Sequence, residues 1–75
     1  MIRREPYRGY VLEADPVCRA GSWRARVVIE LHRHNGVHFQ EVEADPDQRY
    51  GAREEAERAS LAFGRAILDS RPTAE

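Results

Sequence analysis

The stretch Trp23-Arg24-Ala25-Arg26-Val27-Val28-Ile29-Glu30-Leu31 decides the fold, because apolar and polar side chains alternate along most of it. A period of two is typical of a β-strand with one face buried and the other exposed. The polar face carries Arg24, Arg26 and Glu30. We therefore predict a strand over 23–31 whose apolar residues face the core.

Two further strands are predicted beside this one, over about 7–14 and 37–43. Asp15-Pro16 and Gly21-Ser22 bound the first connection, since proline and glycine favour turns. That connection contains Cys18, the only cysteine.

His34-Asn35-Gly36-Val37 predicts a tight hairpin, because Asn-Gly supplies the two positive φ angles of a type I′ turn. In this register His32 lies opposite Phe39. Phe39 is then expected on the face away from Ile29 and Leu31. Either a bulge redirects Phe39, or both faces of the sheet carry apolar groups.

A C-terminal helix is predicted over 52–70, and Pro72 ends it. At about 100° per residue, Leu61 and Leu68 are expected on the side opposite the main apolar stripe, with Gly64 between them. The stripe that would face the sheet comprises Ala52, Ala56, Ala59, Phe63, Ala66 and Ile67.

The predicted fold class is α+β: a three-stranded antiparallel β-meander with one C-terminal helix packed on one face. A single domain of 75 residues is expected, with a flexible arm over 1–6, the meander over 7–43, the helix over 52–70 and a tail over 71–75. The predicted core comprises Tyr10, Leu12, Trp23, Ala25, Val27, Ile29, Leu31, Val42, Tyr50, Ala56, Ala59, Phe63 and Ile67.

Composition excludes several classes of chemistry. All 12 basic residues are arginine, so lysine nucleophiles are excluded, and one cysteine permits neither an intramolecular disulfide nor a four-cysteine zinc site. The arginine and alanine bias is common in GC-rich bacterial genomes. No segment has the apolar run of a signal peptide or a membrane span, so a cytoplasmic protein without membrane contact is expected.

Residues with catalytic or metal-binding chemistry show no recognisable spacing. His32 and His34 are expected on one face of the hairpin and His38 on the other, which does not favour a metal site. Neither the serines nor Cys18 lies in a nucleophile motif. We therefore expect no enzyme activity, no metal and no cofactor.

Arginines give the best polar signal for binding. Arg24 and Arg26 are expected to project from one side of their strand, and Arg8 and Arg33 could extend them into a basic stripe suited to phosphate. The alternative is a solvated face, because nearby glutamates and a net charge of −1 oppose binding to nucleic acid.

A homodimer is also expected, because one helix cannot cover both faces of the sheet. The candidate self-association residues form two groups. Val11, Val28 and Phe39 lie on the predicted outer sheet face, which we favour, and Leu61 and Leu68 lie on the predicted back of the helix.

Three resemblances add to these expectations. Tyr7-Arg8-Gly9, Trp23-x-Ala25-x-Val27 and the segment 50–56 resemble the ethylene-response-factor and phage integrase amino-terminal domains, whose three strands and one helix bind DNA through the sheet; this implies DNA contact at Arg8, Arg24 and Arg26. The segment 54–69 resembles short uncharacterised bacterial proteins built as strands followed by a helix. A weaker resemblance is to HicB-type antitoxin domains.

The sequence therefore predicts a small non-catalytic binding or interaction module whose protein partner it does not identify. The first alternative is a nucleic-acid-binding domain that uses the arginines of the outer sheet face, and the second is an antitoxin-like regulatory domain.

Overall fold

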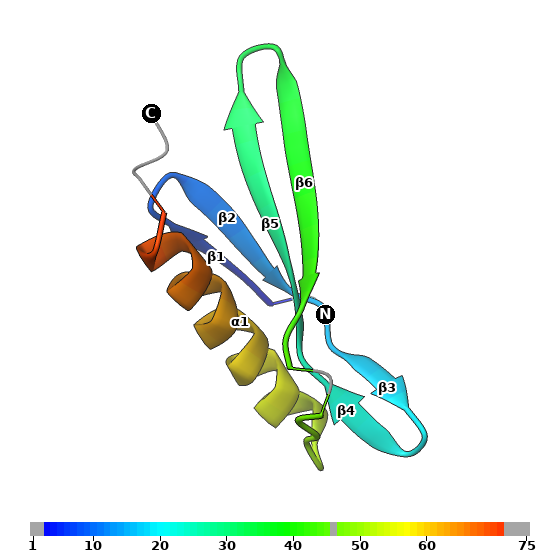
Figure 1. The fold of residues 1–75 in the computed structure, drawn as a ribbon. Coiled ribbons are helices and arrows are strands. Elements are labelled where there is room, and N and C mark those ends of the chain that lie inside the picture. The colour runs from blue at the N-terminus through cyan, green and yellow to red at the C-terminus, as the bar shows by residue number, and fades with distance from the viewer. Residues whose placement is uncertain (1–2, 46, 72–75) are drawn as a thin grey trace.

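A computed structural model describes residues 3–45 and 47–71 and shows an α+β fold (Figure 1). The predicted class is confirmed, but the described residues form six strands rather than three. Their bounds are β1 Arg3–Tyr7, β2 Tyr10–Ala14, β3 Val17–Arg19, β4 Ser22–Arg24, β5 Arg26–Arg33 and β6 Gly36–Glu43, followed by helix α1 Arg53–Asp69.

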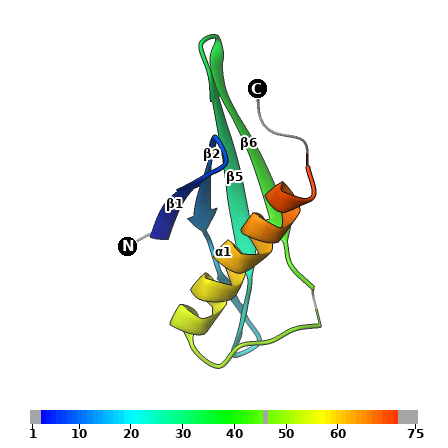
Figure 2. The same cartoon turned by 90° about the vertical axis from the view of Figure 1, so that its left-hand side faces the viewer.

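The main sheet is antiparallel, with the strand order β1-β2-β5-β6. The β3–β4 hairpin is inserted between β2 and β5 and forms a separate two-stranded sheet. Helix α1 crosses one face of the main sheet and packs mainly on β2 and β5 (Figures 1 and 2). The β5–β6 hairpin extends beyond the rest of the sheet.

The expected flexible arm over 1–6 is wrong for its described part, since Arg3–Pro6 belong to β1; residues 1–2 lie outside the described residues. A tight turn with φ of 51° at Arg8 and 82° at Gly9 joins β1 to β2. Both angles are positive, as a type I′ hairpin requires. An Arg-Gly pair is a weaker turn signal than Asn-Gly, so the sequence prediction merged the turn with one strand.

The strand predicted over 23–31 is divided at Ala25 into β4 and β5. Ala20 (φ 49°) and Gly21 (φ 79°) form the turn between β3 and β4. Cys18, expected in a loop, lies exposed in β3 opposite Trp23. The alternation of side chains continues through the break, which is why the pattern alone did not reveal it.

The predicted register of the β5–β6 hairpin is wrong by two residues. His32 pairs with Val37, and Phe39 lies opposite Glu30 rather than His32. The loop is His34-Asn35, and Gly36 opens β6 with φ of 147°. A shift of two preserves the face of every side chain, so Phe39 lies on the face away from the helix, as predicted.

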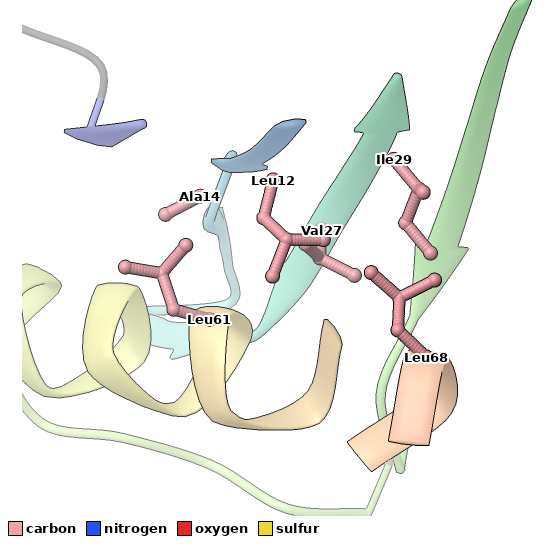
Figure 3. Packing of buried hydrophobic residues seen from close by; sticks show 6 residues of the cluster. All are labelled: Leu12, Ala14, Val27, Ile29, Leu61 and Leu68. Carbon is pink, nitrogen blue, oxygen red and sulfur yellow. The ribbon is translucent and has the colours of Figure 1, made fainter. Parts of the chain in front are cut away.

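The predicted placement of the helix is wrong for Leu61 and Leu68. They are 5% and 2% exposed, respectively, and point into the core against Leu12 and Val27 of the sheet (Figure 3). Gly64 permits the close approach of helix and sheet. A Cβ there would lie 3.0 Å from Leu12 Cδ2 and Val27 Cγ2. The alanine-rich stripe misled the prediction because alanines fit either side of a helix.

The rest of the predicted core is partly confirmed. Leu12, Ala25, Val27, Ile29 and Ala56 are buried, and Tyr10, Val42, Phe63 and Ile67 pack around them half-buried. Trp23, Leu31, Tyr50 and Ala59 are also only half-buried.

Trp23 lies outside the core for a local reason. It belongs to the two-stranded sheet and forms a backbone bridge to Tyr50, with N···O distances of 2.9 Å in both directions. The guanidinium of Arg53 lies 5.5 Å from its ring centroid. Trp23 therefore holds the segment before α1 against the β3–β4 hairpin.

Candidate binding surface

The face of the main sheet opposite α1 is the candidate binding surface, and we call it the outer face. The strand register places two rows of side chains across it. One row is Pro6, Val11, Glu30 and Phe39, and the next is Arg4, Glu13, Val28 and Glu41. Apolar and ionisable groups therefore alternate on this face.

Glu30 is the unusual residue of this surface, because it is only 4% exposed although no helix covers it. Its carboxylate accepts hydrogen bonds from Arg4 Nη2 at 3.2 and 3.4 Å. His32 Nε2 lies 3.1 Å from Glu30 Oε1. Neighbouring polar side chains thus replace the water that a carboxylate normally needs.

Glu13 completes this network, because its carboxyl lies next to that of Glu30 and the two influence each other's ionisation. Its hydrogen bond to Glu30, together with burial, raises the pKa of the Glu13 carboxyl above its usual 4.5. The same hydrogen bond, supported by His32 and Arg4, lowers the pKa of Glu30. Two adjacent carboxyls cannot both ionise without cost, and Glu13 is the member of the pair that binds a proton more readily.

The apolar part of the outer face is most exposed on β6. Phe39 is 65% exposed and Val37 is 44% exposed, and they are the large hydrophobic side chains that stand out in solvent among residues 3–45 and 47–71. Val11 and Val28 share the face, as predicted, but are half-buried. Glu30 lies between Val11 and Phe39, so the expected patch has a carboxylate at its centre.

The four arginines considered for nucleic-acid contact do not form one stripe. Arg8 lies in the β1–β2 turn, where its Nε donates to Asp69 Oδ1 at 2.9 Å. Hydrogen bonds from Tyr7 and Arg8 lower the pKa of Asp69.

The other three arginines are spread over different parts of the sheets. Arg24 lies opposite Val17 in the small sheet. Arg26 Nη2 donates to Asp15 Oδ2 at 2.7 Å. Arg33, at the far end of β5, is about 23 Å from Arg26 at about 3.3 Å per residue.

The histidines do not converge either. His32 lies on the outer face and His38 on the helix face, as predicted, and His34 lies in the loop. Within the described part of the chain, no group of three His, Cys, Asp or Glu residues could hold a metal ion.

An open hollow of about 150 Å³ lies between β5–β6 and the end of α1. Arg71 Nη2 donates to Gln40 Oε1 at 2.9 Å beside it. Its lining comprises Tyr10, Ile29, Leu31, His38, Phe39, Gln40 and Arg71. It mixes aliphatic and polar groups without a buried charge that would select a ligand.

No family model, curated protein or solved structure matches this chain. Helix α1, the helix in the described residues, is not long and apolar enough to span a membrane.

Proposed function

We propose that this chain is a small non-catalytic interaction module that binds a protein partner through the exposed end of its outer face. The observation that supports this most is Phe39, an aromatic side chain that is 65% exposed on the face of the sheet opposite α1. Aromatic residues are enriched in the centres of protein interfaces. We call Val37 and Phe39 the hairpin patch.

The surroundings of the hairpin patch suit an interface. Glu41 and His32 lie next to it on the same face and would form a polar rim, while Phe39 would supply the apolar centre. Glu30 and Arg4 hold the sheet beneath it in place. A partner would therefore meet a prepared surface rather than a mobile one.

The acidic pair supports a structural role rather than catalysis. The carboxyls of Glu13 and Glu30 hydrogen-bond to each other, and Arg4 and His32 occupy further lone pairs of Glu30. General acid–base catalysis needs a carboxyl group that can reach a substrate proton. Here both groups are engaged in holding the sheet.

Photo-crosslinking would test the proposal. A photoreactive residue at position 39 is expected to capture one partner in cells, and the same residue at the exposed helix position 62 is the control. The purified partner should then bind Phe39→Leu nearly as well as the parent and Phe39→Lys about tenfold more weakly, because a buried charge opposes association. Equal capture at positions 39 and 62 would contradict the proposal.

Fluorescence anisotropy with a DNA duplex at low salt separates the nucleic-acid alternative. Contact through phosphates must weaken steeply as salt rises, whereas an apolar protein contact should not. Salt-sensitive binding that Arg24→Ala plus Arg26→Ala abolishes would favour nucleic acid over a protein partner.

A further inference from the structure

The outer edge of β6 is the least protected part of the main sheet. Its eight residues pair without a bulge to β5 on one side, and β6 is last in the strand order. Every residue of β6 except Val42 is exposed. An edge strand presents unpaired backbone N–H and C=O groups, and natural proteins normally protect such an edge.

The opposite edge of the same sheet carries the usual protection. Strand β1 has five residues, and Pro6 interrupts its row of backbone donors. Side chains also tie it to the helix, where Arg65 Nη1 donates to Glu5 Oε2 at 2.7 Å.

Strand β6 has no proline, and α1 packs mainly on β2 and β5 (Figure 1). Its side-chain ties are at Gln40, which accepts from Arg71, and at Glu43, which accepts from Arg19. The row of backbone donors on the β1 edge is thus interrupted, whereas that on the β6 edge is continuous.

We infer that a second copy of this chain pairs with the β6 edge, antiparallel and centred on Phe39, so that the two four-stranded sheets become continuous. This inference rests on the proposed function and specifies its partner. A two-fold axis perpendicular to the sheet relates the copies. The outer faces of both copies then lie on the same side, as the side-chain period of two requires.

The sequence of β6 favours this register over its neighbours. Centring on Phe39 places the two phenyl rings opposite each other and Val37 opposite Glu41 of the second copy. Seven residues of each strand, 36–42, are then paired. Aromatic pairs directly opposite each other stabilise antiparallel strands.

The neighbouring registers are poorer. Centring on Gln40 would place Phe39 opposite a carboxylate. Centring on His38 would pair only five residues and oppose two imidazoles. Centring on Glu41 would oppose two carboxylates, which is destabilising.

Disulfide trapping tests this register without changing Phe39. Val37→Cys and Glu41→Cys, each in a Cys18→Ser background, are mixed under a mild oxidant. Opposed residues of antiparallel strands have Cα atoms about 4.5–5.5 Å apart, within disulfide range. The mixed disulfide is expected to form many times faster than the Val37→Cys homodimer, whose cysteines would be about 13 Å out of register.

Val37→Cys mixed with Glu43→Cys is the matched control, because those positions face each other only when the pairing is centred on Gln40. Equal trapping in both mixtures would indicate random collision and overturn the inference, as would a purely monomeric parent in sedimentation at high micromolar concentration. If position 39 still captures a different protein, the proposed function stands and only self-pairing fails. If position 39 captures no protein and the Val37→Cys/Glu41→Cys disulfide forms no faster than the control, both the proposed function and the self-pairing inference fail.

Discussion

The two faces of the main sheet are closed in different ways. On the helix face, Leu61 and Leu68 pack against Leu12 and Val27 (Figure 3). Gly64 leaves room for these two sheet side chains, which a Cβ would meet at 3.0 Å. On the outer face, Glu30 is buried by neighbouring side chains of the same sheet rather than by another layer. The single helix packs mainly on β2 and β5 on one face, so the outer face depends on polar contacts within the sheet.

The largest expected effect comes from the helix face. Leu12→Ala removes a fully buried side chain, and the lost transfer energy plus the cavity should cost about 3–5 kcal/mol. Stability of about 3–5 kcal/mol is typical for a domain of this size, so the variant should be largely unfolded by circular dichroism. Phe39→Ala, on the outer face, is the control and should change the free energy of unfolding by less than about 0.5 kcal/mol. Similar losses in both variants would erase the contrast between the faces.

Gly64→Val tests the closeness of helix and sheet. The added side chain would meet Leu12 and Val27, and such overpacking typically costs about 1–3 kcal/mol. Ala62→Val is the matched control, because Ala62 is exposed and should lose only helix propensity, about 0.6 kcal/mol. Urea denaturation measures both. Equal losses would mean that the helix stands further from the sheet than the structure places it.

Trp23→Ala should destabilise the protein by about 1–2 kcal/mol, because it removes a half-buried ring and its contact with the Arg53 guanidinium. The sequence placed Trp23 in the core, where the cost would be about 3–5 kcal/mol. Thermal melting of the variant decides between these values. Complete unfolding would favour the core position that the sequence predicted.

The smallest effect concerns the pH dependence of the outer face. The pKa of Glu13 is raised, so its stabilising contribution is present below 4.5 and is lost as pH rises through the raised value. The pKa of Glu30 is lowered, so its contribution is present above 4.5 and is lost as pH falls through the lowered value. Together they give a maximum in mildly acidic solution.

In Glu13→Gln, the loss of stability as pH rises should be smaller than in the parent, because an amide N–H can donate to Glu30 at any pH. Glu54→Gln, on the exposed side of α1, is the control and should follow the parent. Melting temperatures between pH 4 and pH 8 measure the difference. An unchanged slope in Glu13→Gln would show that the carboxyl of Glu13 does not influence the ionisation of Glu30.

Local patterns were sufficient for much of the fold. The alternation along 23–31 and the helix pattern before Pro72 predicted the class and the side of the sheet that Phe39 occupies. The missed turns at Arg8-Gly9 and Ala20-Gly21 have arginine or alanine, rather than asparagine or aspartate, at the first positive-φ position, so two hairpins were read as longer strands or loops. The sequence prediction gave the position of helix α1 along the chain correctly but turned the wrong side of the helix toward the sheet, since alanines fit either side.

The candidate site was less predictable. The outer face carries Val11, Val28 and Phe39, as expected. A register error of two residues does not alter this result, because a shift by an even number of residues leaves each side chain on the same face. The burial of Glu30 was not foreseen, because it depends on β1, which brings Arg4 across β2 from a segment expected to be a free arm. The four arginines are dispersed rather than aligned in one stripe. Arg8 binds Asp69 at the end of the helix, and Arg26 binds Asp15 across the base of the β3–β4 hairpin.

The sequence by itself determined the periodicities, namely which residues alternate along each strand and where the helix runs, and it excluded an intramolecular disulfide and a lysine nucleophile. Only the tertiary structure decided which leucines enter the core, which carboxyl of the Glu13–Glu30 pair binds a proton more readily and which strands form the two edges of the sheet. Those properties depend on contacts between segments distant in sequence, and a local sequence pattern does not determine the free energy of such contacts.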